Sequence, residues 1–284
     1  MSTRARLESA RGGRGTSFVC LAVIVMSPGV ASAEDGATGA ASGCQPAALA
    51  TGVVGTVVDG RTFVLDDGRE VRLAAIEVPD DTDQGSDSGR GGRAKATLQE
   101  LVAGRAVALR RLGPERDRHG RLLAQAFLVE SKPERWIQAA MIRSGHARMA
   151  ARVGDRACAA ELLSHERSAR EAKLGLWADP YYVMRRADDP AAVSRERGRF
   201  TIVEGSVLSV RESGGTIYVN FGKRWSEDFT VTIAKRNERV FATAGVEPKR
   251  LAGRRVRVRG WIEERGGPWV EATRPEQIEL LERN

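Results

Sequence analysis

The sequence predicts two successive β-rich units, of which the first is a small closed β-barrel with helices, an α+β fold. Three observations carry this prediction: short β-prone runs divided by Asp-Gly pairs, helical spacing after them, and a second series of strands near the C-terminus. Five short strands with helices on one side are typical of such a barrel. The 284 residues, 42% of them apolar, suffice for two modest packed cores.

The first unit begins as a three-stranded meander over residues 52–76. Asp59-Gly60 and Asp67-Gly68 divide it, and Asp-Gly pairs between β-prone runs are strong hairpin signals. A loop rich in Asp, Ser and Gly follows at 80–92. The elements expected after this loop are a helix at 93–103, strands at 106–112 and 122–129, and helices at 134–144 and 156–173.

Strands return after residues 179–198, which contain two prolines and many charges and which we expect to be a linker. We therefore place the first domain at about 51–178 and a second, smaller barrel at about 199–284. The strands expected in this second barrel are 200–210, 217–221, 229–233, 254–261 and 269–273.

The fourth of these strands is strongly basic. Arg255, Arg257 and Arg259 alternate with valines, so the three guanidinium groups share one face of the strand. With aromatic residues near them in the sequence, the three arginines are candidate substrate contacts of a single-strand nucleic-acid groove. The alternative is a structural barrel in which they pair with Glu263, Glu264 and Glu271.

Residues 1–33 are typical of a cleaved export signal. Four arginines precede an apolar run at 18–26, and Ala31-Ser32-Ala33 is a small-residue cleavage pattern. We expect cleavage after Ala33, a flexible leader at 34–50, and a periplasmic or secreted mature protein. The apolar run is too short for stable insertion across a membrane.

Cysteine content and charge agree with export and with a polyanionic partner. Cys20 lies in the expected signal, which leaves Cys44 and Cys158 to pair in an oxidising compartment; the alternative is two unpaired thiols. The formal net charge of +8 suits DNA or RNA, although a soluble protein with a mildly cationic surface has the same balance.

Three short motifs of the first unit occur in a fixed order. They are Val58-Asp59-Gly60-Arg61-Thr62, residues 71–80 (VRLAAIEVPD) and residues 117–124 (DRHGRLLA), and a closing helix over 166–177 follows them. Together they resemble the staphylococcal nuclease (thermonuclease) family over residues 52–177. The resemblance implies an OB-type barrel with three helices, and the second unit resembles the OB-like module found after such domains in some bacterial exported proteins.

The resemblance also implies a site for phosphodiester hydrolysis. Arg72 and Arg121 match the family's two phosphate-binding arginines, whose planar fork suits two phosphate oxygens. Asp80 stands where the family has its proposed general base, a glutamate. These three residues are the catalytic candidates.

A calcium site is the third implication. Asp59 and Glu77 match metal-binding aspartates of the family, and a hard divalent ion bound by oxygen ligands could polarise the phosphate. Arg61 departs from the pattern, since it replaces another metal-binding aspartate and a cation there repels the metal. Two functions follow as expectations: an exported phosphodiesterase for DNA or RNA, or a non-catalytic binding module for a polyanion or a protein.

Overall fold

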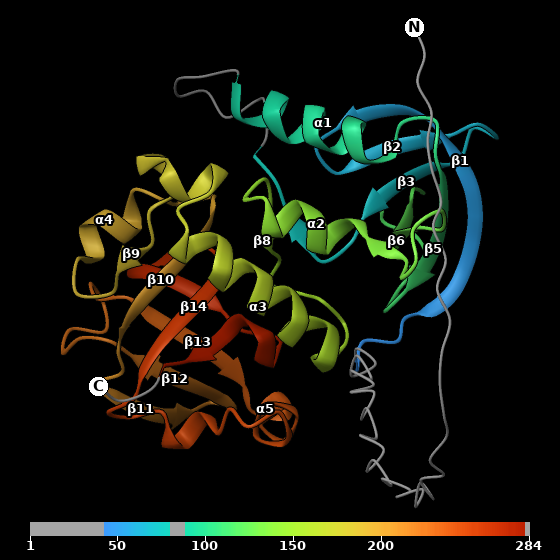
Figure 1. Ribbon diagram of the computed structural model, residues 1–284. Coiled ribbons are helices and arrows are strands. Elements are labelled where there is room, and N and C mark those ends of the chain that lie inside the picture. The colour runs from blue at the N-terminus through green and yellow to red at the C-terminus, as the bar shows by residue number, and fades with distance from the viewer. Residues whose placement is uncertain (1–42, 80–88, 282–284) are drawn as a thin grey trace, which may run out of the picture. The chain divides into compact units, whose positions relative to one another are not determined.

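The computed structural model describes residues 43–79 and 89–281 (Figure 1). The expected signal segment, residues 1–33, and the candidate base Asp80 lie outside these ranges. Within them, no helix is long and apolar enough to cross a membrane.

A five-stranded barrel forms the first half of the described chain. Its strands are β1 (Ala47–Asp59), β2 (Thr62–Leu65), β3 (Glu70–Leu73), β5 (Ala106–Arg111) and β6 (Leu122–Leu128). The ladder runs β3-β2-β1-β5-β6, and the parallel pairing of β3 with β6 closes it. The closed barrel and its helices confirm the predicted fold class.

Strand β1 is long enough to pair on both sides. It starts at Ala47, within the predicted leader, because Ala47 pairs with Arg111 of β5. Its later half pairs with β2, and register shifts occur in both ladders. Such bulges bend a strand, and Figure 1 shows β1 as a curved ribbon that belongs to both sides of the barrel.

Three helices complete this part of the fold: α1 (Gly89–Val102), α2 (Ile137–Arg143) and α3 (Arg156–Glu171). Helix α1 begins inside the segment predicted as loop, because Gly91 and Ala94 are buried against the barrel. Gly60 makes this approach possible, since a Cβ atom there would lie 2.7 Å from the Cβ atom of Ala94. Two-residue strands β4 (Ile76–Glu77), β7 (Arg135–Trp136) and β8 (Arg148–Met149) and the short helix η1 (Gly175–Ala178) complete the region.

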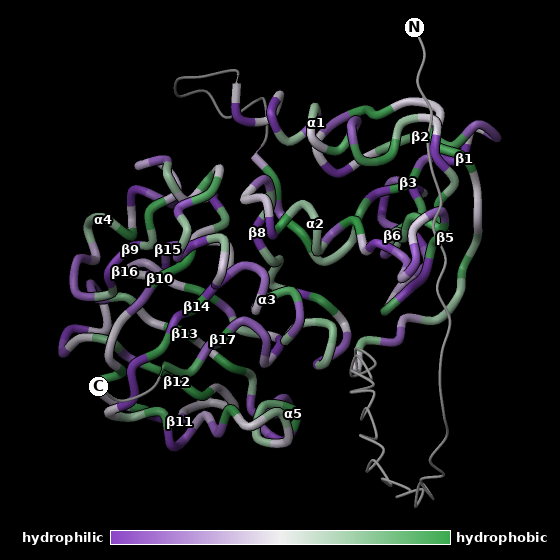
Figure 2. The backbone as a smooth tube through the Cα atoms, in the orientation of Figure 1, coloured by the Kyte–Doolittle hydropathy of each residue, from purple (hydrophilic) through white to green (hydrophobic). Residues whose placement is uncertain are grey.

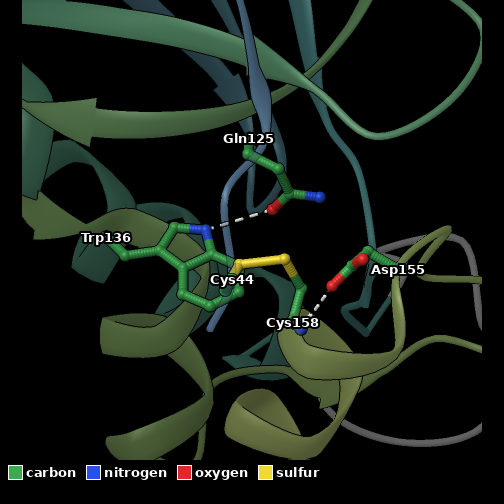
Figure 3. The surroundings of a disulfide bond; sticks show 5 residues. All are labelled: Cys44, Gln125, Trp136, Asp155 and Cys158. Carbon is green, nitrogen blue, oxygen red and sulfur yellow. Dashed lines mark hydrogen bonds between the residues drawn. A yellow bond between two sulfur atoms is a disulfide. The ribbon is translucent and has the colours of Figure 1, made fainter. Parts of the chain in front are cut away.

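A disulfide joins Cys44, just before β1, to Cys158 in the first turn of α3 (Figure 3). Asp155 caps this helix, because its side chain accepts a hydrogen bond from the backbone N–H of Cys158. Nearby, the indole N–H of Trp136 donates to Gln125. The bond ties the start of the barrel to α3, the last of its three helices.

The second half of the described chain is also built on β-sheets. One sheet has the order β17-β14-β10-β9 and the other β11-β12-β13-β16-β15. Their strands are β9 (Arg185–Arg186), β10 (Phe200–Ser206), β11 (Ser209–Ser213), β12 (Thr216–Asn220), β13 (Thr230–Ala234), β14 (Arg255–Trp261), β15 (Glu263–Arg265), β16 (Gly267–Glu271) and β17 (Ile278–Leu280). The parallel pairing of β13 with β16 repeats the parallel pairing of β3 with β6, but an OB-like module here stays a prediction.

Residues 179–198 are structured, in contrast to the expected linker. They contain the short helix η2 (Pro180–Tyr182), β9 and α4 (Pro190–Ser194). β9 pairs in parallel with β10, and Val193 of α4 is fully buried. The prolines begin the two helices instead of breaking structure, because each occupies a first-turn position where no backbone donor is needed.

Each half has its own apolar core. The first is centred on residues of the barrel interior and the inner faces of α1, α2 and α3, and the second lies among the C-terminal strands and α5 (Glu238–Thr243). Figure 2 shows apolar and polar residues alternating along the elements that enclose these cores.

The basic strand β14 does not form a free groove. Its arginines share one face, as alternation predicts, but that face meets acidic residues of the same chain. Arg255 and Arg257 pair with Glu204, and Arg259 is 1% exposed and pairs with Glu166 of α3. The expectation that these arginines line an open groove is therefore wrong, and the expected partners Glu263, Glu264 and Glu271 are not the ones used.

Glu166 is the centre of a buried ionic network. Its two carboxylate oxygens each lie 3.0 Å from a guanidinium nitrogen of Arg259, and Arg170 contacts it at 3.2 Å. It also accepts a 2.6 Å hydrogen bond from the backbone N–H of Met149 in β8. Burial alone would raise the pKa of Glu166, but Arg259, Arg170 and the Met149 N–H together hold that pKa below its ordinary value. One carboxylate thus joins α3, β8 and β14.

The first prediction concerns the disulfide. Replacing both Cys44 and Cys158 with alanine should lower the free energy of unfolding by about 2–4 kcal/mol, because the bond closes a long loop in the unfolded chain. Urea denaturation with and without a thiol reductant measures this. The reductant should shift the wild-type midpoint to that of the variant and leave the variant unchanged, and a shift in the variant would contradict the assignment.

The second prediction concerns the Glu166–Arg259 pair. Glu166→Gln should cost about 3–5 kcal/mol of unfolding free energy, because Arg259 would stay buried without a full partner. The cost should be complete at pH 7 and shrink only below pH 4.5, the ordinary pKa of the carboxyl, since the lowered folded pKa stabilises the fold above that pH.

A double-mutant cycle provides the control. Combining Glu166→Gln with Arg259→Met should cost less than the sum of the single changes by about 1–3 kcal/mol. The same cycle at the exposed pair Arg186–Asp188 should give less than about 1 kcal/mol of coupling. Equal coupling energies at the two pairs would show that burial does not strengthen the Glu166–Arg259 interaction.

Candidate functional site

The turn between β1 and β2 presents Arg61. The Asp59 carboxylate accepts a hydrogen bond from the backbone N–H of Arg61 at 2.8 Å, which fixes this tight turn. Thr62 and Phe63, the next two residues, are buried in the barrel. The Arg61 side chain therefore starts from a rigid position at the edge of the barrel.

Arg61 forms an ion pair with Glu77. Its Nη1 atom lies 2.6 Å from Oε2 of Glu77, and each side chain is 19% exposed. Glu77 is held in place by β4, which pairs with β8 so that Glu77 lies opposite Arg148. The Arg61 guanidinium is therefore bonded to the Glu77 carboxylate, which the resemblance assigned to a metal.

The donor set does not fit calcium. The Asp59 carboxylate is bonded to the backbone of the turn, the Glu77 carboxylate is paired with Arg61, and a cation stands at the sequence position where the resemblance implies a third acid. Across residues 43–79 and 89–281, no group of three or more His, Cys, Asp or Glu side chains is placed to hold a metal ion. Calcium binds through six to eight oxygen ligands, so this arrangement replaces a divalent ion with a fixed organic cation.

Arg72 is the cation available to a ligand. Its side chain projects from β3 and has no hydrogen bond or ion pair to any residue that the structure describes, while its backbone belongs to the β2–β3 and β3–β6 ladders. Burial lowers its pKa, and the neighbouring guanidinium groups of Arg61 and Arg121 lower it further. The carboxylates of Glu77 and Asp59 raise this pKa in part, but the overall shift is downward.

Arg121 is oriented by Asp117 of its own turn and lies near Glu70 of β3. Its Nε and Nη2 atoms contact Asp117 at 2.8 and 2.7 Å, and Nη1 lies 3.7 Å from Glu70. Burial would raise the pKa of Asp117, but Arg121 and backbone N–H donors lower it overall. Arg121 is near Arg72 but does not line the cavity that Arg61 and Arg72 share.

This cavity measures about 490 Å³ and has walls from both halves of the chain. Arg61, Arg72 and Glu77 line it on the barrel side, and Trp261 and Glu263 line it from the second half. Trp261 is 53% exposed, so its ring offers a surface to a ligand. No local pattern indicates that Trp261 faces the first barrel, since that depends on how two distant segments pack.

Two comparisons with known proteins find a match for part of the chain. Residues 70–179 match the family model described as staphylococcal nuclease homologue. The chain is also similar to Protein ParB of Escherichia coli, with 33% identity over 138 residues, which are 46% of this chain and 75% of that protein. The family match includes Arg72, Glu77 and Arg121, while the turn that carries Arg61 lies before it.

The third prediction tests the calcium site. Arg61→Asp should create calcium binding with a dissociation constant of about 10⁻⁴–10⁻³ M, because it removes the cation and adds a carboxylate beside Asp59 and Glu77. Isothermal titration calorimetry measures it. Arg61→Gln, which removes the charge without adding a carboxylate ligand, should show no heat of calcium binding. If the wild-type protein bound calcium as tightly as Arg61→Asp, the conclusion that the site does not fit calcium would be refuted.

Proposed function

This chain belongs to the family of staphylococcal nuclease homologues, and we propose that its first barrel binds the phosphodiester backbone of DNA or RNA without calcium. The observation that carries the proposal is the Arg61–Glu77 ion pair beside the guanidinium of Arg72, which has no ion pair among the residues that the structure describes. In this proposal Arg72 grips a phosphate, and Arg61 supplies the fixed positive charge that a metal would otherwise provide.

The chemistry of Arg72 supports this function. A guanidinium group stays charged at any physiological pH, and its fork can donate two parallel hydrogen bonds to phosphate oxygens. Because Arg61 and Arg121 lower the pKa of Arg72, bringing an anion to the cluster relieves repulsion as well as forming bonds. Arg121, held by Asp117, adds longer-range attraction and contacts the strand next to the cavity in this proposal.

Phosphodiester hydrolysis is the second candidate function. The position of Arg72 at a cavity of about 490 Å³ favours it, because there is room for the scissile group and a water. Asp80 would accept the proton of that water, and Arg72 would stabilise the charge that develops on the phosphate. Without a metal to polarise the phosphate, cleavage would be slow and independent of calcium.

Export is proposed as well. The Cys44–Cys158 disulfide supports it, because such bonds persist in oxidising compartments such as the periplasm or the extracellular space. In this proposal residues 1–33 are removed after Ala33, and the mature protein meets nucleic acid outside the cytoplasm.

The fourth prediction tests binding at Arg72. Arg72→Gln should weaken binding of a fluorescent single-stranded oligonucleotide by about 10- to 100-fold, because a charge-assisted contact to phosphate is lost. It should also reduce the slope of log K against log salt by about 1. Fluorescence anisotropy in EDTA at several salt concentrations measures both quantities.

Arg105→Gln is the matched control, since Arg105 is an exposed arginine just before β5. It should leave affinity nearly unchanged, and an equal loss in both variants would show that only net charge matters. The same samples, analysed on a gel, decide between the candidate functions. Slow cleavage in EDTA that disappears in Asp80→Asn, with binding intact, selects hydrolysis; binding without cleavage at any calcium concentration selects the binding module.

A further inference from the structure

A second cavity lies on the other side of the Arg61–Glu77 pair. It measures about 260 Å³, and its lining includes Arg61, Glu77, Arg148, Glu196, Arg199 and Trp261. Arg61, Glu77 and Trp261 line the first cavity too, so the two spaces share a wall. None of the residues singled out in the sequence for phosphate contact lies in this second cavity.

Arg148 is the unusual member of this lining. It is 9% exposed, its Nε atom is buried without a hydrogen-bond partner, and its guanidinium forms no hydrogen bond or ion pair within the described residues. The group stacks between aromatic rings, 4.9 Å from the ring centre of Tyr182 and 5.1 Å from that of Phe200. Burying a charge without an acidic partner costs free energy, so such a group is expected to meet an anion.

The acids near Arg148 already serve other cations. Glu77 is paired with Arg61, and Glu196 is shared by Arg185 and Arg199. Three guanidinium groups and two carboxylates line the cavity among the described residues, and Arg148 is the cation without an ion pair there. Glu166, the next carboxylate that acts on Arg148, is bound by Arg259 and Arg170.

From this buried cation we propose that the Arg148 cavity binds the terminal phosphate of a nucleic-acid strand, a phosphate monoester. A monoester carries close to two negative charges at pH 7, whereas an internal phosphodiester carries one, so the monoester is attracted more strongly to the Arg148 guanidinium. The inference rests on the proposed function, because it assigns the neighbouring phosphodiester of the same strand to Arg72.

The residues shared by the two cavities are evidence that one nucleic-acid strand could occupy both. The Arg61 guanidinium lies between the two phosphate positions, and the half-exposed ring of Trp261 borders both. A base at the end of a strand could stack on this ring, which is a common and sequence-tolerant contact. The protein would then recognise strand ends in preference to internal positions.

The fifth prediction compares the ends of one oligonucleotide. A strand with a phosphate at its 5′ or its 3′ end should bind at least about tenfold more tightly than the same strand with hydroxyl ends, as expected for a charge-assisted contact. Fluorescence anisotropy on the full chain measures the three affinities. Equal affinities would overturn the inference while leaving nucleic-acid binding at Arg72 intact.

Two substitutions at one position, Gly198, test whether the cavity binds the phosphate. Gly198 lines it with φ +75° and open space around its Cβ position, and Asn and Asp tolerate this conformation better than most residues. Gly198→Asp should abolish the preference for the phosphorylated end by placing a negative charge in the cavity, and Gly198→Asn should keep it. Arg148→Met should abolish it as well, with hydroxyl-ended strands bound as by wild type.

Inorganic phosphate separates the two proposals. Quenching of tryptophan fluorescence by phosphate, absent in Trp261→Phe and in Gly198→Asp, would support the site even if oligonucleotides did not bind, and the proposed function alone would then fail. Inorganic phosphate bound as tightly as the phosphorylated strand would overturn strand-end recognition, because the rest of the strand would add nothing. A preference for phosphate that persists in both Gly198→Asp and Arg148→Met would overturn the site.

Discussion

The buried carboxylate of Glu166 holds the arrangement together. It bonds to Arg259 of the C-terminal half, to Arg170 of its own helix and to the backbone of β8. β8 in turn pairs with β4, which carries Glu77. The short β4–β8 pairing therefore connects the position of Glu77 to the Glu166–Arg259 contact between the two halves. Residues 42–284 cluster as one compact unit.

The candidate site shows how an organic cation can stand where a family uses a metal. The Arg61 guanidinium is covalently part of the fold, so its charge neither dissociates nor depends on the supply of an ion. It also brings hydrogen-bond donors in one plane, whereas a metal accepts ligands from many directions. Such a site favours gripping a phosphate over activating water, because a guanidinium cannot bind and acidify a water molecule as a metal does.

Local patterns predicted the barrel and part of the site. Asp-Gly turns and helical spacing located most strands and α3, and the motifs placed Arg72, Arg61 and Glu77 near one another. They could not show that Arg259 would be buried, because strand alternation gives the face of a side chain but not what covers that face. Trp261, on the same strand β14, could not be placed beside the first barrel for the same reason. Arg148 escaped prediction because β4 and β8 are two-residue strands whose pairing depends on distant contacts.

The covalent bridge between Cys44 and Cys158 also decides how the protein would respond to mechanical force. Tension applied from the N-terminal side reaches α3 through the sulfur atoms, so it bypasses every strand of the first barrel. Pulling on the two ends of the oxidised chain would load the ionic contact of α3 with β14 and leave the barrel slack. Only after reduction would the strands themselves bear the load and add their length to the extension.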